Sequence, residues 1–497
     1  MKLKLLEWVI NIISVSNKNS EWLLIINANI IDVKNKIIHE NSYIISLNGK
    51  IYQIGSMKQL TIPKKMEILD VRSMYIIPGL IDSHVHLAQP GVDDYGRIFT
   101  ESITKKYIRH SHQTIKSGVT TIRNMPGAYG YSIFKFRNKV NKGKYIGPRI
   151  LASGPALSVP YGYFSLKRFI PAPSCLVNIL SYIFGAHGLS IDVLNPNDVK
   201  KTIKRLKRKG VDFIKTTTPG TLLSLIDDQP NSRDYYIKRG VNSQVIDANM
   251  NIDILSSIIK YAHDEGLKVS THLICLPENF KEAAELGVDS IEHTPIGYID
   301  DETFDIMRDK NIYWVPTAYC YFNWYNLITY PELYENDKIK EYIPKPYYLI
   351  GKKSLNRQRE EIKNRIDPNW SHFYSEMPKF KEKYFPYNLK NAINKGIKIV
   401  AGVDAGMGES GYVHHGLLYK ELEIFVQNGM DEYEALRTAT INASEILGIE
   451  KEVGTIEIGK KADIVVLSKN PIEDISYLSE IRYVVKEGKI LYKAINE

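Results

Sequence analysis

The sequence predicts an α/β fold, in which a barrel of eight parallel strands and their helices is joined to a small β domain. Between residues 75 and 404, short apolar strands alternate with helical segments, which is the pattern of a (β/α)8 barrel of the TIM type. Both ends of the chain carry Ile and Val runs broken by Asn-Gly and Gly-Ser turns. Because chain termini often lie close together, we expect the two ends to form one β-sandwich. The 497 residues are enough for both parts.

The predicted domain organisation follows from these patterns. It comprises an N-terminal helical extension (1–21), a composite β-sandwich (22–75 and 450–497) and the barrel (76–449), with insertions at 158–189 and 319–387. In the extension, Glu7 interrupts the apolar residues and no small-x-small cleavage site follows. We interpret it as an amphipathic helix packed on the body of the protein, with contact with a membrane surface as the less favoured alternative. We expect no segment to span a bilayer and no membrane contact.

The first barrel strand is the stretch YIIPGLIDSHVHL, from Tyr75 to Leu87. Side chains alternate faces along a strand, so His84 and His86 point the same way. Two imidazoles at a strand end are either two arms of a metal site or ordinary polar histidines, and this pair alone does not decide between them. The other seven strands are expected at 119–125, 148–154, 211–217, 268–273, 290–294, 312–317 and 397–404.

Helices are expected between most of these strands, for example at 252–266, 278–287 and 301–311, each ending at Gly or Asn. The two insertions follow candidate strands and should emerge at the face where barrel enzymes hold their sites. The first is apolar and Pro-rich, whereas the second is long, irregular and rich in Tyr, Phe and Trp. A cap over a pocket and a dimer interface both explain this composition.

Composition and charge exclude some partners and compartments. The net charge of +9 is spread along the chain, and the basic run 200–209 has apolar residues at Ile203 and Leu206, so it reads as the solvated face of a helix rather than a nucleic-acid site. Cys175, Cys275 and Cys320 are far apart and odd in number, which predicts no disulfide framework and fits a reducing cytoplasm.

Chemically reactive residues fall at the ends of particular predicted strands. The ends of parallel strands meet around one axis of a barrel, so these side chains should converge on one point. Imidazole and carboxylate groups in this arrangement predict a metal site. The residues are His84, His86, Lys215, His272, His293 and Asp404.

These motifs resemble the metal-dependent amidohydrolase superfamily, near its imidazolonepropionase and prolidase-like branch. The resemblance covers roughly residues 22 to 495 and is carried by PGLIDSHVHL, SGVTTIRNM, GPRILASG, DFIK, AHDEGLKVSTH, GVDSIEHT, AGVDAG, HGLLYKELEIFVQNGMDEYEALRTATINASEILG and GTIEIGKKADIVVL. It implies a centre of two divalent metal ions in which His84 and His86, with Asp404, hold the more buried metal. His272 and His293 would hold the second metal, and Lys215, as an N6-carboxylated lysine, would bridge the two.

The resemblance also implies a reaction. Zn²⁺ is the default metal for such ligands, although Mn, Fe or Co also suit them. A metal-bridging water would become hydroxide near neutral pH, and Asp404 would orient it and pass its proton to the leaving nitrogen of an amide, peptide or cyclic amide. The apolar insertions indicate a bulky or hydrophobic small-molecule or peptide-like substrate. Relatives near imidazolonepropionase are commonly dimeric, which implies a homo-oligomer.

Departures from the family pattern put the family's usual substrates in doubt. Asn124 stands where members often have Asp, and Pro219-Gly220 stand where they have Gly-Gly. The loop that usually carries Gly-Gly-His-Gly is Gly185-Ala186-His187-Gly188 here. Candidate substrate contacts are His187, Tyr161, Tyr163 and His415, and His414-His415 are alternatively second-layer or helix-capping residues.

Two other functions remain open at this stage. The same scaffold could hydrolyse a lactone, a phosphotriester or a ring amidine, because fold and metals do not determine the substrate. A non-catalytic scaffold whose cap binds a partner is a third hypothesis, against which the presence of all six ligand-type residues argues.

Overall fold

The computed structural model describes residues 21–61, 66–88, 102–127, 129–162, 165, 189–217, 250–273, 276–335, 345–366, 368–406 and 413–494. The predicted extension at 1–21 and most of the first insertion lie outside these ranges. The chain divides into two units, one comprising Met1–Ile81, Ile115–Thr120 and Glu432–Glu497, the other Asp82–Thr114 and Thr121–Asp431. The domain boundaries expected from the sequence stay predictions.

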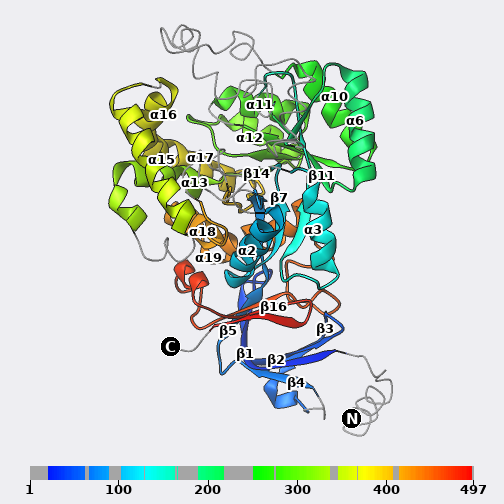
Figure 1. Cartoon of the computed structure of the whole chain (residues 1–497). Coiled ribbons are helices and arrows are strands. Elements are labelled where there is room, and N and C mark those ends of the chain that lie inside the picture. Colours follow the sequence, from blue (N-terminus) through cyan, green and yellow to red (C-terminus); the bar gives the residue numbers. More distant parts are fainter. Residues whose placement is uncertain are drawn as a thin grey trace. The chain divides into compact units, whose positions relative to one another are not determined.

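The first unit is built on one mixed sheet with strands from both ends of the chain (Figure 1). Antiparallel pairing of β15 with β5 joins the C-terminal strands to the N-terminal ones. The sheet order is β17-β16-β15-β5-β1-β2-β3, with β4 beside β1. The strands are β1 (Trp22–Asp32), β2 (Ile37–Leu47), β3 (Lys50–Ser56), β4 (Glu67–Asp70), β5 (Tyr75–Pro78), β15 (Ile464–Leu467), β16 (Ile481–Lys486) and β17 (Lys489–Lys493).

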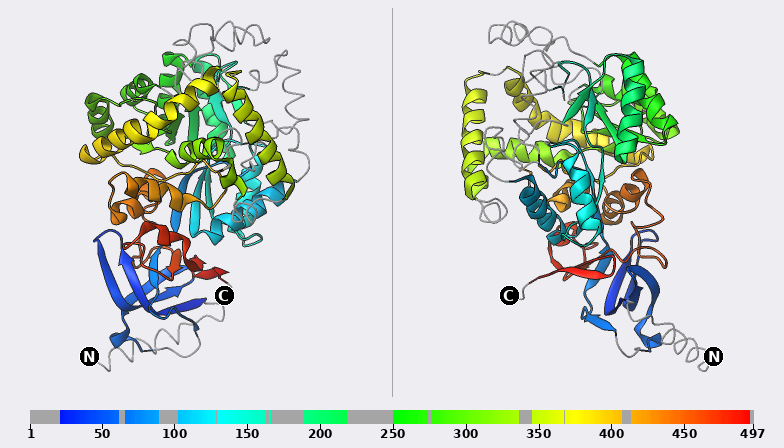
Figure 2. Two further views of the ribbon diagram at one scale, coloured as in Figure 1. Left: turned by 90° about the vertical axis from the view of Figure 1, so that its left-hand side faces the viewer. Right: turned by 45° about the vertical axis from the view of Figure 1, so that its right-hand side comes forward.

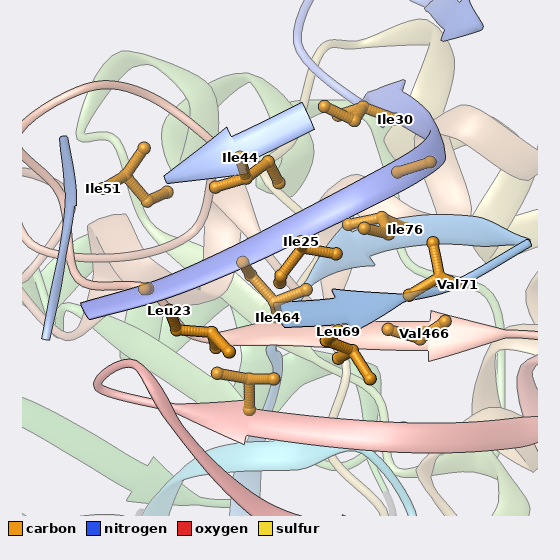
Figure 3. Packing of buried hydrophobic residues seen from close by; sticks show 13 residues of the cluster. Leu23, Ile25, Ile30, Ile44, Ile51, Leu69, Val71, Ile76, Ile464 and Val466 are labelled. Carbon is orange, nitrogen blue, oxygen red and sulfur yellow. The ribbon is translucent and has the colours of Figure 1, made fainter. Parts of the chain in front are cut away.

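This sheet wraps around its own apolar core. Ile25, Ile44, Ile51, Ile464 and Val485 belong to one buried cluster, although their strands span the whole sheet order. Figure 3 shows labelled members of the cluster converging from several strands. Backbone hydrogen bonds join Ile51 of β3 to Gly459 and Lys460, in the segment that leads into β15. The short helices of this unit are η1 (Met57–Gln59), α19 (Glu432–Thr438), α20 (Ile441–Ile446) and η5 (Ile475–Ser479).

Seven described strands of the barrel pair in parallel in two groups, β6-β7-β8 and β11-β12-β13-β14. The groups join where Asp212 N donates to Ala152 O (3.0 Å). The predicted eighth strand is reduced to two parallel bridges, Trp314 to Ile399 and Val85 to Ala405, and these close the circuit. The strands are β6 (Leu80–Val85), β7 (Val119–Asn124), β8 (Arg149–Ala152), β11 (Phe213–Thr217), β12 (Lys268–His272), β13 (Ser290–Glu292) and β14 (Tyr313–Val315). The α/β fold class expected from the sequence is confirmed, and the parallel pairing fits the expected barrel.

Helices alternate with these strands and pack against one another, α6 on α10, α11 on α12 and α12 on α17 (Figure 2). The helices predicted at 252–266, 278–287 and 301–311 are present as α10, α11 and α12, and each is followed by a Gly or Asn with positive φ. The helices between the strands are α2 (Ile103–Lys116), α3 (Ser132–Asn141), α6 (Pro196–Lys209), α10 (Ile252–Asp264), α11 (Pro277–Leu286), α12 (Asp301–Asp309) and α18 (Leu418–Gln427). A short parallel pair, β9 (Ala156–Ser158) and β10 (Ser190–Asp192), flanks the first insertion.

The basic run 200–209 lies on α6, as the sequence indicates. Val199, Ile203 and Leu206 are fully buried, while most of the Lys and Arg residues are exposed. The helix is capped by Asn195, whose side chain accepts two backbone N–H groups, and it ends at Gly210 in the left-handed region. No helix within the described ranges is long and apolar enough to cross a membrane.

The second insertion is helical, so the expectation of an irregular segment was wrong. Its elements are α13 (Ala318–Thr329), η3 (Pro331–Glu335), α15 (Lys345–Lys363), α16 (Pro368–Lys379), a π-helical turn η4 (Phe380–Tyr384) and α17 (Phe385–Asn394). In α13, Cys320, Tyr321, Trp324, Leu327 and Ile328 are buried, which is helical spacing. The many Tyr residues obscured the helical periodicity in the sequence, because a Tyr side chain is found on both buried and solvent-exposed faces of a helix.

The opening stretch is two strands rather than one. β5 pairs with β15 in the mixed sheet and β6 pairs in the barrel, and Gly79 lies between them. Gly79 N donates to Asp463 O (2.8 Å), so the backbone is held on both sides of the break. A Cβ added at Gly79 would lie 2.2 Å from Thr120 Oγ1, so no larger residue fits there without movement.

We therefore expect Gly79→Ala to lower the free energy of unfolding by about 1–3 kcal/mol, the usual cost of overpacking. Because the clash is with the Thr120 side chain, Gly79→Ala/Thr120→Ala should recover part of the loss relative to Thr120→Ala alone. Thermal and urea unfolding followed by circular dichroism measure both effects. Equal loss in the two backgrounds would contradict this packing.

Candidate metal centre

The centre is assembled where the barrel closes. Asp404 N donates to His84 O (2.8 Å) and His86 N donates to Ala405 O (2.7 Å), around the bridge between Val85 and Ala405. This ladder sets the two histidines in register with Asp404. Because a shift of one residue would turn every side chain to the other face, the pairing determines that all three groups meet.

His84, His86 and Asp404 form a compact buried group whose ligand atoms all lie within 4.8 Å of one another. Asp404 Oδ1 lies 3.5 Å from His84 Nε2 and 3.2 Å from His86 Nε2. The Nδ1 of His84 faces Glu292 Oε2 at 2.7 Å, and the Nδ1 of His86 faces Pro126 O at 2.5 Å. Since both partners accept only, each Nδ1 carries the proton and each Nε2 presents a lone pair to Asp404.

Burial keeps the His84 ring neutral, so that its Nε2 retains a lone pair. Burial lowers the pKa of His84 to about 4, helped by Lys215 and opposed by Asp404 and Glu292. The ring is therefore neutral near pH 7, and its Nε2 lone pair faces a carboxylate oxygen. Two lone pairs and a carboxylate oxygen converging in a buried site fit a divalent cation.

His272 and His293 lie beside this group but are not part of it. His293 Nε2 and His272 Nδ1 are 2.8 Å apart, and the ring centroids of His84 and His293 are 4.9 Å apart. Burial and the neighbouring histidines hold the pKa of His293 well below its usual value. Its Nδ1 lies 2.8 Å from Thr317 Oγ1, which orients the ring. Both rings are thus neutral, and one nitrogen of each faces the other ring.

Lys215 projects from β11 and is completely buried. Within the described part of the chain its Nζ has no hydrogen-bond partner. Burial lowers its pKa to about 7, with Glu292 and Asp404 opposing and Arg123 adding to the fall. A buried amine without a partner is costly, so Lys215 fits a site in which a further group completes its contacts.

Glu292 is the functional residue that sequence reasoning missed. It has no exposed surface, and its carboxylate faces His84, Arg123, Ser270 and Ser290. Burial raises the pKa of Glu292, but Arg123, Lys215 and His84 outweigh it and hold the value well below the usual range. The available signal was an acidic side chain within the predicted strand 290–294, immediately before His293.

Backbone conformation marks the same residues. His293, Thr317 and Asp404 have φ of 76°, 50° and 57°, in the left-handed region that non-glycine residues rarely adopt. Each costs of order 1–3 kcal/mol and persists only where the surroundings impose it, typically at functional sites.

The first turn of α13 forms one wall of the centre. Cys320 Sγ lies 3.8 Å from Asp404 Oδ2, and the Tyr321 ring lies edge-on to His293 with centroids 6.2 Å apart. Glu421, fully buried on α18, accepts the N–H groups of Ala318 and Tyr319 (2.8 and 2.6 Å) and so holds the start of the helix.

The substrate candidates are less clearly placed. His187 and Tyr163 lie outside the described residues. Tyr161 lies in the turn after β9 with φ of 64°. The His415 ring stacks on His110 at 4.3 Å, and His110 Nδ1 donates to Leu87 O (2.8 Å), one residue after His86. Their roles in substrate binding stay predictions.

The capping interpretation of His414 and His415 was wrong. The N-cap residue of α18 is Leu417 rather than either histidine, and the Leu417 side chain makes no capping hydrogen bond. Both histidines are buried, and burial lowers the pKa of His414 to about 4.

Comparison with known proteins decides the family. The sequence model of the amidohydrolase family matches residues 75–491. The chain belongs to the amidohydrolase family. Family membership and the geometry together make it an enzyme, a metal-dependent hydrolase of carbon–nitrogen bonds.

Named amidohydrolase relatives cover most of the chain. Ochratoxinase of Aspergillus niger is 25% identical over 432 residues, which are 84% of this chain and 75% of the relative. Imidazolonepropionase of Clostridium tetani is 20% identical over 481 residues, 93% of each chain. Among solved structures, a Xaa-Pro dipeptidase with bound methionine has a TM-score of 0.68 and 25% identity, covering 95% of this chain and all of the other.

We expect His86→Ala to lower the Zn²⁺ content of the reconstituted protein by about one equivalent per chain, because it removes one of three donors from a buried group. Elemental analysis after dialysis measures the content. His263→Ala is the control, since His263 pairs with Asp289 at the surface. Equal metal content in wild type and both variants would count against the centre.

Proposed function

We propose that this amidohydrolase cleaves the amide bond of a bulky or hydrophobic N-acyl amino acid or dipeptide-like substrate, using two divalent metal ions, with Zn²⁺ as the first choice. The observation that carries the proposal is the convergence of His84, His86 and Asp404, with His272 and His293 alongside. His84 and His86, with Asp404, would hold one metal, and the other two histidines would hold the second.

Lys215 is proposed to bridge the two metals as an N6-carboxylated lysine. The support is its complete burial, its lack of a hydrogen-bond partner within the described residues, and its contribution to the lowered pKa of His84, His272 and His293. A carbamate would replace a buried amine by an anion with two oxygens, which would suit a site holding two divalent cations. Bound metals would supply a polarised carbonyl and a water of lowered pKa.

Asp404 is the proposed catalytic base. Its Oδ1 faces the His84 and His86 rings and its Oδ2 faces the Cys320 thiol, so the carboxylate is held from both sides. From this position it can accept a proton from the attacking water and deliver it to the leaving nitrogen. The left-handed backbone of Asp404 keeps the side chain aimed at the centre.

The aromatic helices favour a hydrophobic substrate. Tyr321 contacts Phe373 and Phe380 from α16 and η4 at centroid distances of 6.0 and 5.8 Å while its edge faces His293. An aromatic wall reaching a metal centre supports the interpretation of the second insertion as a cap over the pocket. The ochratoxinase and dipeptidase relatives are named for substrates with such bonds.

A homo-oligomer and a reducing cytoplasm remain part of the proposal. The first rests on resemblance to imidazolonepropionases, and the second on three cysteines with no disulfide spacing.

Zn²⁺-reconstituted protein should hydrolyse hydrophobic N-acyl amino acids and dipeptides, and Asp404→Asn should lower kcat by about 10²–10⁴ fold, because it removes the proton acceptor. Amine release measured by a ninhydrin-type assay tests this. Asp289→Asn, a carboxylate of the same barrel outside the centre, is the control. Hydrolysis confined to lactones, phosphotriesters or small polar rings would reject the proposed substrate class.

Tyr321→Ala should raise KM for substrates with aromatic acyl groups more than for those with acetyl groups, with a smaller effect on kcat. The reason is that the substitution removes a side chain that lines the site and leaves the reacting groups in place. Tyr325→Ala, one turn further along α13 where the ring packs on Tyr374, should leave the preference unchanged. Steady-state kinetics over a series of acyl groups separates the two. A uniform loss for all substrates would speak against a specificity role.

A further inference from the structure

Glu292 contacts His84 behind the proposed metal centre, and the reaction proposed above gives it no role. Its Oε2 is 2.7 Å from His84 Nδ1, while its Oε1 accepts from Ser270 Oγ (2.7 Å) and Ser290 Oγ (2.6 Å) and from Arg123 Nη2. These polar contacts are all with buried groups, Ser290 on β13 itself and the other three on β6, β7 and β12. Such complete satisfaction keeps the carboxylate in one orientation.

Arg123 makes this buried charge tolerable. Its Nε donates to Ser83 O (2.7 Å), directly before His84, and its guanidinium lies over the Phe213 ring at 5.2 Å. An isolated carboxylate in the barrel interior would cost several kcal/mol, whereas a paired and hydrogen-bonded one is stable. The pair therefore connects β6, β7 and β13 at the level of the centre.

The carboxylate determines which nitrogen of His84 is available. An ionised carboxylate only accepts, so Nδ1 must carry the ring proton and Nε2 must present its lone pair beside Asp404. His86 is held in the same tautomer by a neutral backbone carbonyl of Pro126. His84 thus has the charged acceptor, which makes its ring the more basic donor toward a cation.

We propose that Glu292, charge-balanced by Arg123, is a positioning residue that holds His84 in the Nδ1-protonated tautomer and thereby sets the affinity of the centre for divalent metal. The proposal rests on the proposed metal centre and acts through His84 rather than through the substrate.

The test compares Zn²⁺ affinity by chelator competition and the visible absorption of the Co²⁺-substituted protein. Glu292→Gln and Arg123→Gln/Glu292→Gln should weaken Zn²⁺ binding about 10–100 fold, the usual effect of losing a partner behind a metal-binding histidine. Glu292→Asp retains the charge that Arg123 needs but shortens the side chain, and should fall between these and wild type. The Co²⁺ bands should shift in all three.

The matched control is Arg137→Gln/Asp212→Asn. This pair also joins an arginine to a carboxylate in the same barrel, at 2.5 Å, and Asp212 accepts the Ala152 N–H. It should change thermal stability while leaving Zn²⁺ affinity within about twofold, well below the 10-fold lower limit expected for Glu292.

Wild-type affinity and unchanged Co²⁺ bands in the folded Glu292 variants would overturn the proposal. An equal loss in the control would do the same, because it would assign the effect to general destabilisation. Metal binding does not depend on the substrate, so failure of every amide in the assay would reject the proposed function and leave this result standing. A wild-type protein that binds no Zn²⁺ would overturn both.

Discussion

The closing contact of the barrel is the constraint on which the centre depends. The bridge between Val85 and Ala405, with its flanking hydrogen bonds, is where the last strand meets the first. This contact is an isolated β-bridge, because the last segment of the barrel forms no continuous strand. Its position nevertheless places Asp404 Oδ1 3.5 Å from His84 Nε2 and 3.2 Å from His86 Nε2. The chemistry of the protein therefore rests on a few backbone contacts between segments far apart in the chain.

Charge burial is the second constraint. The barrel interior holds Lys215, Glu292, Arg123 and Asp404 with little or no exposure, and none of these groups is stable there alone. Glu292 and Arg123 compensate each other, and His84 and His293 are neutral because burial lowers their pKa values. Lys215 and Asp404 are left facing the histidines, which is where a cation or an added carboxylate would complete the balance. This arrangement of buried charged and neutral groups is suited to binding metal ions.

The second, aromatic insertion packs directly against the residues of the centre. Glu421 holds the start of α13 by two backbone hydrogen bonds, and the helix then places Cys320 against Asp404 and Tyr321 against His293. Contacts of Tyr321 with Phe373 and Phe380 continue the wall into the neighbouring helices. The insertion is therefore connected to the reactive residues through packed side chains, as a pocket wall must be if it is to select substrates.

The sequence by itself determined the fold class, the alternation of strands and helices, and the order of His84, His86, Lys215, His272, His293 and Asp404 along the barrel. These follow from local rules, because period-two alternation puts His84 and His86 on one face and strand ends converge in a parallel barrel. Only the tertiary structure decided that Gly79 divides the opening stretch, that the second insertion is helical, and that Glu292 supports His84. Those features depend on which side chains meet across strands and helices far apart in the chain, and no local pattern contains that information.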